Sequence, residues 1–504
     1  MCGLMSGMEI IVKRRAGVLL AISSIPSKYG IGGFTKEAYE FVDFLKASGQ
    51  SLWQILPLGP TGYGDSPYQS FSTFAGNPYY IDLQEFIDLG WLTAKECGSY
   101  KVSHPEYVDY EGIFNSRFAL LRKAYKNSNI TADPDFAAFV KENDYWLDGY
   151  ALYMAIKDSK KGISWLEWED DIKLRKPAAI ESYKKKLKDD YVFYQFQQYF
   201  FFKQWFKLKE YANSKGIEIV GDIPIYVALD SADTWSNPEL FRLDDDCNPT
   251  HVAGCPPDAF TADGQLWGNP LYRWDYHKQT GYKWWLLRLS ACYRLYDIVR
   301  IDHFRGFDEY YSIEYGRPNA IDGEWLPGPG YDLFKAIKNN LGNKQIIAED
   351  LGFMTDSVRR LVKKTKYPNM KVIMFAFDTE SDSEHMPHNY EHNCVVYTGT
   401  HDNDTLVHWY KTLKRKEKAL VKDYLGLKRA STDDICDGIV RSALSSVADT
   451  CIIPMQDYLR LDGEARMNMP STLGTNWKWR MRTDALTPEL SSRMLKWATV
   501  YRRI

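Results

Sequence analysis

Eight short runs of apolar residues recur along the chain without the polar alternation of a half-buried strand. Such unbroken runs are typical of parallel strands that are buried on both faces. Stretches with helical periodicity separate most of them, and alternating strands and helices form the βα units of a parallel sheet. The pattern therefore predicts an α/β fold, a (β/α)8 TIM barrel. The predicted strands are residues 17–22, 51–56, 217–222, 297–302, 345–349, 371–377, 394–398 and 451–455.

Two of the intervening helices have clear signals. The first has Thr35 as its N-cap and Gly49 after its end, and the second begins after Ser431. Both repeat apolar residues at helical spacing: Ala38, Phe41, Val42 and Leu45 in the first, and Ile435, Ile439, Leu444 and Val447 in the second. Between the sixth and seventh strands, residues 378–393 are few and rich in Pro, His and Asn. We therefore expect one barrel helix to be missing or reduced.

Two long insertions interrupt the βα pattern. Residues 57–216, between the second and third strands, are mostly helical and aromatic, and residues 223–276 contain scattered Pro, Gly, Asp and Trp with little periodicity. Barrels tolerate long insertions at the active-site face, where loops follow the strands. We expect residues 1–504 to form a single catalytic barrel unit with a helical insertion at 57–216 and a loop-rich one at 223–276.

The composition excludes several classes of protein. The formal net charge of −3 and the pI near 6.3 give no basic field for nucleic acid or an anionic membrane. The apolar run at residues 16–22 follows a basic stretch as in a signal peptide, but it lacks a small-x-small cleavage site and reads as the first strand. No segment offers the uncharged length of a membrane helix. Eight scattered cysteines without a C-x-x-C pair favour a reduced, cytoplasmic protein.

Three of the apolar runs end in carboxylates. Asp302 and Glu349 end the fourth and fifth strands and Asp402 follows the seventh, at the end of the barrel where loops carry catalytic residues. Retaining cleavage of a glycosidic bond uses a nucleophile and an acid/base, and a third negative charge can stabilise the transition state. Arg300 faces the same side of its strand as Asp302 and favours the ionised form, whereas apolar neighbours favour a protonated Glu349.

Each of these residues also has a simpler interpretation. A lone buried Asp302 beside arginines is most often part of a structural ion pair, and His303 could be a satisfied core histidine. Asp350 rivals Glu349, but strand periodicity sends it to the opposite side. Asp404 is explained by a turn or an N-cap before the next helix, whereas His401 and Asp402 are harder to explain by packing.

Metal binding is a separate hypothesis. His385, His388 and His392 have a spacing that could suggest zinc, but they lie in the loop that approaches the opposite end of the barrel. A metal-dependent barrel hydrolase with His303 and His401 as ligands usually needs a histidine pair after an early strand, and residues 22–24 offer none. We expect no metal and no cofactor.

Several ordered segments closely resemble the signatures of amylomaltases, the 4-α-glucanotransferases of glycoside hydrolase family 77, which are relatives of the α-amylases. The strongest are residues 299–307 (VRIDHFRGF), 347–352 (IAEDLG) and 397–405 (YTGTHDNDT). The resemblance implies that Asp302 is the nucleophile, Glu349 the acid/base and Asp402 the transition-state stabiliser. Further matches are 66–69, 76–83, 221–227, 254–258, 265–270, 328–330, 387–390 and 476–480, so the resemblance covers most of the chain.

The resemblance also implies a set of substrate contacts. Tyr68, in a turn that begins at Ser66, would stack on the glucose at the scission point, and Arg300, His303 and His401 would donate to that sugar and its nucleophile. A loop arching over the acceptor side would contribute Asp258, Gln265, Trp267 and Asn269. Asp378 and Asn476 would make secondary sugar contacts.

The function that the resemblance implies is transfer of an α-1,4-glucan segment to the 4-hydroxyl of another glucan or of glucose. The partners would be maltooligosaccharides and α-1,4-glucans, as donor and as acceptor. The high aromatic content, 15%, fits core packing and also stacking on sugar rings. Three alternatives stay open: an α-1,4-glucan hydrolase with the same chemistry, a metal-dependent TIM-barrel hydrolase, and a catalytically silent glucan-binding scaffold.

Overall fold

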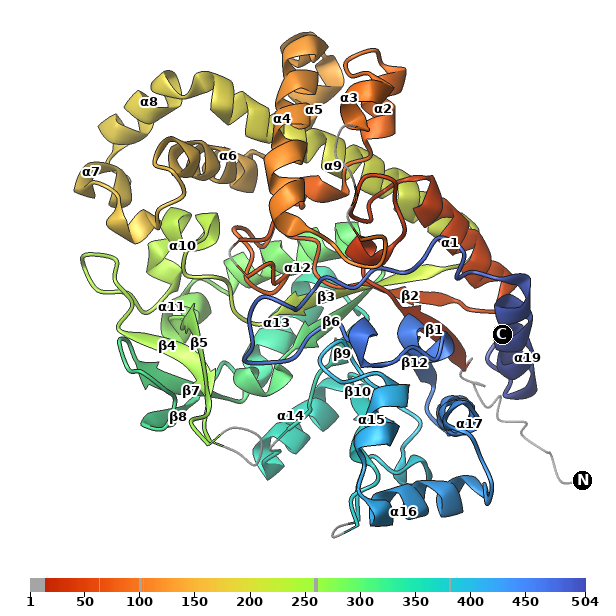
Figure 1. Ribbon diagram of the computed structural model, residues 1–504. Helices are drawn as coiled ribbons and strands as arrows, with labels where there is room; N and C mark the ends of the chain where they lie inside the picture. The colour runs from red at the N-terminus through yellow and green to blue at the C-terminus, as the bar shows by residue number, and fades with distance from the viewer. Residues whose placement is uncertain are drawn as a thin grey trace, which may run out of the picture.

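Eight parallel strands close into a barrel in the computed structural model, which describes residues 14–504 except 63, 99–101, 103, 258–261, 353, 380 and 381 (Figure 1). The predicted (β/α)8 barrel is confirmed, and each predicted strand overlaps an observed one. Neighbouring strands follow the order β1-β12-β11-β10-β9-β6-β3-β2. The strands are β1 (Arg15–Leu19), β2 (Leu52–Gln54), β3 (Glu218–Pro224), β6 (Ile298–Asp302), β9 (Ile346–Ala348), β10 (Asn369–Val372), β11 (Cys394–Tyr397) and β12 (Thr450–Pro454).

Helices surround the barrel and present one apolar face to it. In α1, the predicted apolar residues are all buried, and the helix begins after Thr35 as expected. In α17, a capping box joins Ser431 and Asp434, but the helix ends at Ser445, so Val447 lies outside it and is 43% exposed. The helices of the barrel layer are α1 (Lys36–Ala47), α9 (Lys188–Ser214), α12 (Lys283–Leu295), α13 (Tyr331–Leu341), α14 (Asp356–Thr365), α15 (Leu406–Thr412), α16 (Arg415–Leu425), α17 (Thr432–Ser445), α18 (Met455–Tyr458) and α19 (Pro488–Val500).

The connection from β10 to β11 lacks a full helix in the part of it that the structure describes. It contains short 3-10 turns at Ile373–Phe375 and Pro387–Asn389, as the sequence indicated. The sixth strand is shorter than predicted, because the chain leaves the sheet at Val372 and forms the first of these turns. Asp378 therefore follows a turn and does not end a strand.

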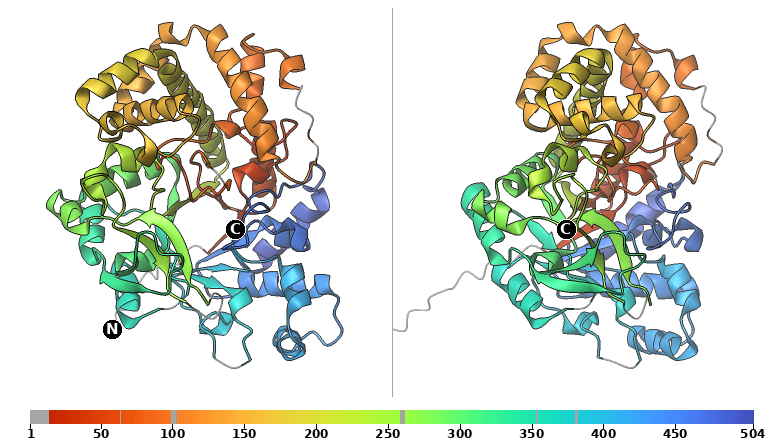
Figure 2. Two further views of the ribbon diagram at one scale, coloured as in Figure 1. Left: turned by 60° about the vertical axis from the view of Figure 1, so that its left-hand side comes forward. Right: turned by 90° about the vertical axis from the view of Figure 1, so that its left-hand side faces the viewer.

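A layer of helices lies beside one edge of the barrel (Figures 1 and 2). Its longest helix, α9, carries a buried row of aromatic side chains and ends directly before β3, so it joins this layer to the barrel. Helices α4 and α6 pack against α9. The layer comprises α2 (Leu83–Asp88), α3 (Ala94–Cys97), α4 (Tyr110–Ser128), α5 (Pro134–Glu142), α6 (Asp144–Ser159), α7 (Asp170–Lys173), α8 (Pro177–Lys186) and part of α9.

A second, four-stranded antiparallel sheet lies beside the barrel in the order β5-β4-β7-β8 (Figure 1). Its strands are β4 (His251–Cys255), β5 (Gln265–Pro270), β7 (Glu309–Glu314) and β8 (Gly323–Pro327), and α10 (Ala232–Ser236) and α11 (Trp274–Gln279) flank β4 and β5 in the chain. The sequence pattern predicts a loop-rich segment at 223–276, where β4 and β5 lie, and it predicts no strand at β7 or β8. The strands are short, the register shifts between Val252 and Gly254, and β4 pairs with β7 across a long stretch of chain, so local periodicity is weak.

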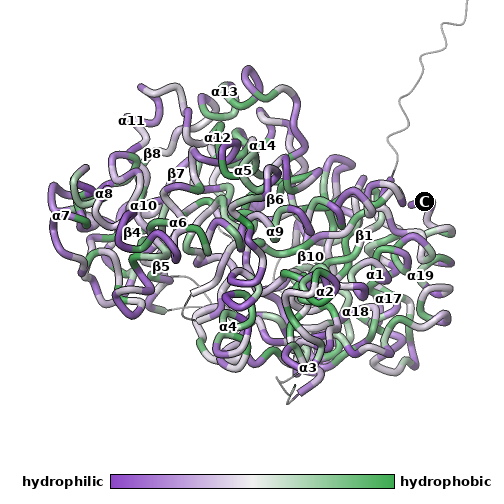
Figure 3. The backbone as a smooth tube through the Cα atoms, turned by 90° about the horizontal axis from the view of Figure 1, so that it is seen from above, coloured by the Kyte–Doolittle hydropathy of each residue, from purple (hydrophilic) through white to green (hydrophobic). Residues whose placement is uncertain are grey.

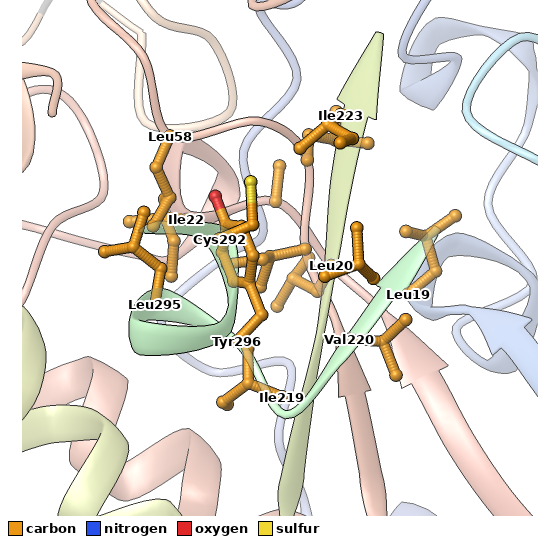
Figure 4. Packing of buried hydrophobic residues seen from close by; sticks show 14 of the residues in the cluster. Leu19, Leu20, Ile22, Leu58, Ile219, Val220, Ile223, Cys292, Leu295 and Tyr296 are labelled. Atoms are coloured by element: carbon orange, nitrogen blue, oxygen red, sulfur yellow. The ribbon is translucent and has the colours of Figure 1, made fainter. Parts of the chain in front are cut away.

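The core is continuous from the barrel interior into the surrounding helices. Along those helices hydropathy alternates, as expected for elements with one face toward the barrel (Figure 3). In Figure 4 the side chain of Ile219 from β3 lies near Tyr296, whereas that of Val220 lies on the other side of the strand. The next residue, Gly221, has no side chain, and a Cβ at this position would lie only 2.1 Å from the Tyr296 ring. Within the described residues, no helix has both the length and the apolar character needed to cross a bilayer.

Candidate active site

Neighbouring strands bring three acidic side chains together at the C-terminal end of the barrel. In the parallel register, Asp222 of β3 lies opposite Arg300 of β6. The Arg300 guanidinium donates to both oxygens of Asp222, at 2.7 and 2.6 Å, and to Oδ1 of Asp302 at 2.9 Å. Asp222 and Arg300 are buried, whereas the Asp302 side chain is 30% exposed. Arg300 therefore anchors Asp302 and leaves it accessible at the barrel mouth.

Glu349 directly follows β9 and is held by main-chain donors. Its Oε2 accepts from the N–H of His303 and its Oε1 from the N–H of Leu351, both at 2.7 Å. Burial, with the nearby charge of Asp302, raises the pKa of Glu349 to about 8. A carboxyl group in this state is protonated at neutral pH and can donate a proton. Its neighbour Asp350 points elsewhere and accepts from the N–H of Met370.

His303 has an unusual backbone conformation that serves Glu349. Its φ is +53°, a left-handed conformation that is uncommon outside glycine. This conformation directs its N–H to Glu349. The imidazole packs edge-on against Trp267, with ring centroids 4.8 Å apart. Burial lowers the pKa of His303 to about 4, so the ring is neutral at pH 7.

Tyr68 and His401 form a stacked pair beside Asp222. Their rings lie 5.0 Å apart at an angle of 17°, and the Tyr68 hydroxyl donates to Asp222 at 2.9 Å. Trp477 packs against both rings. In the turn before Tyr68, the Ser66 hydroxyl accepts from the N–H of Tyr68 and so shapes the loop.

Asp402 lies on the loop between β11 and α15, and its contacts come mainly from the segment after β12. Its Oδ1 accepts from the Asn468 amide at 2.6 Å, and its carbonyl accepts from Arg466 at 2.9 Å. His401 Nε2 lies 3.4 Å from its Oδ2. The side chain is 43% exposed. Asp404 accepts from the N–H of Thr405, and Thr405, not Asp404, is the N-cap of α15.

The β5 strand brings three of the predicted acceptor-side residues together. Trp267 donates from its indole N–H to Gln265 at 3.0 Å. Asn269 is buried, accepts from the Gln69 amide at 3.2 Å and donates to the carbonyl of Val227 at 2.7 Å. Asn269 therefore supports the loop of Tyr68 through its neighbour Gln69. Asp258, predicted in the same loop, lies outside the described residues.

Two predicted sugar contacts, Asp378 and Asn476, lie on loops outside the barrel strands. Asp378 is exposed and follows the 3-10 turn after β10. The side chain of Asn476 bonds to Met469 and Thr472, and so closes the loop that ends at Trp477. Near this loop is a cavity of about 1000 Å³, whose walls include Asn476, Leu473, Tyr110, Phe118 and Phe193, and the three carboxylates are not part of its lining.

The three histidines of the return loop do not converge. His385 accepts from the N–H of Val372, His388 contacts the Tyr424 hydroxyl, and His392 is largely exposed beside Asp449. Over the described ranges, no group of three or more His, Cys, Asp or Glu side chains is arranged to hold a metal ion.

Sequence reasoning missed three residues of this site. Asp222 ends the apolar run 217–222 in the same way as Asp302 and Glu349 end theirs, so the same sequence pattern could have identified it as a site residue. Arg466 and Asn468 lie in an irregular segment, and nothing local indicates that they reach Asp402. Their role is visible only in the folded chain.

Comparisons with known proteins show the family of the chain and support its fold. A family model described as 4-alpha-glucanotransferase, of glycoside hydrolase family 77, matches residues 20–487. A 4-alpha-glucanotransferase from Clostridium butyricum is 50% identical over 489 residues, which are 96% of this chain and 99% of that protein. The solved amylomaltase from Streptococcus agalactiae in complex with acarbose is 43% identical, with a TM-score of 0.94 over 97% of this chain and all of that one. An amylomaltase from Corynebacterium glutamicum, 16% identical over 96% of this chain and 75% of that one, shares the fold with a TM-score of 0.77.

Proposed function

The chain belongs to the 4-alpha-glucanotransferases of glycoside hydrolase family 77, and from this premise we propose that it works by a retaining double displacement through a covalent glucosyl-Asp302. The substrates in this proposal are maltooligosaccharides and α-1,4-glucans, as donor and as acceptor. The observation that carries the mechanism is the pairing of Asp302, held by the Arg300 cation, with a Glu349 whose pKa is raised to about 8.

The first step breaks the donor. A carboxylate oxygen of Asp302 attacks C1 of the glucose at the scission point, and the bond from C1 to the bridging oxygen breaks. Glu349 gives its proton to that oxygen, so the rest of the chain leaves with a free 4-hydroxyl. Arg300 orients Asp302, and the main-chain donors of His303 and Leu351 orient Glu349.

The second step makes the new bond. The 4-hydroxyl oxygen of an acceptor attacks C1, its proton goes to the Glu349 carboxylate, and the ester to Asp302 breaks. Two displacements at C1 return the α configuration. Asp402 faces the positive charge that develops on the sugar in both transition states. The stacked rings of Tyr68 and His401 provide the surface against which this sugar packs.

Water competes with the acceptor for the intermediate. Transfer prevails only if the acceptor is bound in attack geometry, because a bound group has a far higher effective concentration than one in solution. Trp267, packed on His303 and joined to Gln265, offers an aromatic surface for the acceptor. In this proposal the chain is one catalytic unit, with the insertion at 57–216 beside the site and the one at 223–276 over the acceptor side.

The product pattern from maltotriose tests the proposal. We expect free glucose together with maltopentaose and longer chains, and almost no gain in total reducing ends. Trp267→Ala should lose more of its transfer activity than of its donor cleavage, and so should shift the balance toward hydrolysis. The matched control is Trp91→Ala, a partly buried tryptophan that packs against Phe86 and Phe200 in the helical layer and should leave the balance between transfer and hydrolysis unchanged. If wild-type protein raises reducing ends in step with the maltotriose consumed, the transfer mechanism is wrong.

A further inference from the structure

The loop that carries His401 and Asp402 has little internal structure to fix it to the barrel. The N–H and hydroxyl of Thr400 both donate to the Asn403 side chain, at 2.8 and 3.0 Å, and the N–H of Asn403 returns to the Thr400 carbonyl. These contacts fold the tip of the loop. They do not determine where the tip lies relative to the carboxylates of β6 and β9.

One buried carboxylate contacts both ends of this loop. Asp457, in the short helix α18 after β12, accepts at Oδ2 from the hydroxyl of Thr398 at 2.6 Å and at Oδ1 from the N–H of Leu406 at 2.9 Å. Thr398 is the residue after β11, and Leu406 is the first residue of α15. The two oxygens of a single side chain therefore close the loop at the point where it leaves the sheet and the point where it enters the helix.

The buried position of Asp457 is energetically unfavourable for an ionised carboxylate. Its side chain is buried, as are Thr398 and Leu406, and burial raises its pKa to about 7. A buried carboxyl group is costly unless hydrogen bonds satisfy it, and an apolar residue would fill the same space at lower cost. What an apolar residue cannot provide is two acceptors aimed at the two ends of one loop.

We propose that Asp457 is a positioning residue for Asp402, because it closes the 399–405 loop and so sets the place of the stabilising carboxylate opposite Asp302 and Glu349. This inference rests on the proposed role of Asp402. The hydrogen bonds of the Asp457 carboxylate go to the two ends of the loop, so in this proposal it acts through Asp402 and not on the reacting atoms.

A double-mutant cycle tests this coupling. Asp457→Ala, Asp402→Asn and the double variant are compared by kcat and KM with α-maltotriosyl fluoride as donor, so that weak activities are measurable. Asp457→Ala alone should lower kcat about 10- to 100-fold, the range that a misplacement of roughly 1 Å can cause. In the Asp402→Asn background the same change should cost less than about twofold, because the group it positions is already gone.

The matched control is Asp297→Ala at the opposite end of the barrel. Asp297 also uses a carboxylate to bind a main-chain N–H, that of Ile219, and the Asn213 side chain, both at 2.8 Å. Its loss should lower the melting temperature and cost the same small factor in kcat in both backgrounds. Asp457→Asn should stay close to wild type, since an amide can accept from Leu406 and donate to the Thr398 oxygen.

An equal loss from Asp457→Ala in both backgrounds overturns the inference, as does a wild-type kcat with a lower melting temperature. Full activity of Asp402→Asn overturns the role of Asp402 itself, and the inference with it. If Asp457→Ala does not fold, Thr398→Val performs the same test, because it removes one of the two hydrogen bonds and preserves the shape of the side chain. It should give a smaller loss of kcat that again vanishes in the Asp402→Asn background.

Discussion

Asp302 and Glu349 lie at the ends of neighbouring strands and are held by Arg300 and by main-chain N–H groups, whereas Asp402 lies on a loop and is held by side chains from a distant segment. The strand-borne pair inherits its spacing from the hydrogen bonds of the barrel, between β6 and β9. The loop-borne carboxylate depends on Asn468, Arg466 and the two-point contact of Asp457. One half of the site is therefore as rigid as the sheet, and the other is only as rigid as the side chains that hold it.

The largest expected effect comes from breaking the strand-borne half at Arg300. Arg300→Met leaves Asp222 buried with an unpaired charge, and removing one partner of a buried pair costs about 3–5 kcal/mol in the free energy of unfolding. We expect a steep fall in both melting temperature and kcat. Adding Asp222→Asn should restore much of the stability, because the unpaired charge is gone, but none of the activity, because Asp302 is still unanchored.

Chemical denaturation and kinetics on the three proteins measure this. Arg317→Met, which removes an exposed pair with Glu314, is the control and should change stability by less than about 1 kcal/mol. If Arg300→Met and the double variant are equally unstable, the buried pair is not what holds this half of the site together.

A smaller effect on kcat is expected from a substitution at Asn468, which holds the loop-borne carboxylate Asp402. Asn468→Asp places a second carboxyl group 2.6 Å from Asp402, and two such groups hold one proton between them. At low pH the new acid is protonated and can still donate to Asp402, so activity survives. As pH rises the shared proton is lost, and the two charges repel. We expect the alkaline limb of the kcat profile to move to lower pH, with a loss of about 10- to 100-fold at neutral pH.

A pH series of kcat measures that shift. The control is Asn143→Asp, the same substitution at a buried asparagine between α5 and α6, which contacts Trp146 and Arg294. It should lower stability and leave the shape of the profile unchanged. An unshifted profile for Asn468→Asp would show that Asn468 does not hold Asp402 during turnover.

The smallest effect concerns stability and follows from the raised pKa of Glu349. A group whose pKa is raised on folding favours the folded state fully below its unfolded value, and this contribution is lost as pH rises through the folded value. For Glu349 the window runs from the ordinary value near 4.5 to about 8. The Glu349→Gln variant has no proton to lose at this position. Its melting temperature should therefore rise relative to that of the wild type as pH increases from 5 to 8.

Melting curves across that window check the sign. Glu181→Gln, on the exposed surface of α8, is the control and should follow wild type at every pH. A constant difference between Glu349→Gln and wild type over the window would mean that the pKa of Glu349 is not raised. The same ionisation predicts that the first chemical step of the wild type slows as pH rises through about 8.

The same contrast explains how much of the molecule could be predicted from the sequence. The eight barrel strands and the carboxylates at their ends follow from local apolar runs, because strand order and parallel pairing bring those ends together. The strands β4, β5, β7 and β8 were missed because they are short and because the pairing of β4 with β7, which joins the pairs β4–β5 and β7–β8 into one sheet, is between segments far apart in the chain. Asn468 and Asp457 were missed for a related reason, since each contacts a loop more than fifty residues away in the sequence. What depends on the barrel sheet could be predicted, and what depends on long-range pairing or long-range side-chain contacts could not.

The central claim, a covalent glucosyl-Asp302, is tested most directly by trapping the intermediate. α-Glucosyl fluoride needs no proton for its leaving group, so Glu349→Gln should still react with it and should then release the sugar slowly, for want of a base. The intact protein should gain the mass of one glucosyl unit, and peptide mapping should place it on Asp302. Asp302→Asn should gain none. A glucosyl group mapped to another residue, or equal labelling of the two variants, would contradict the account.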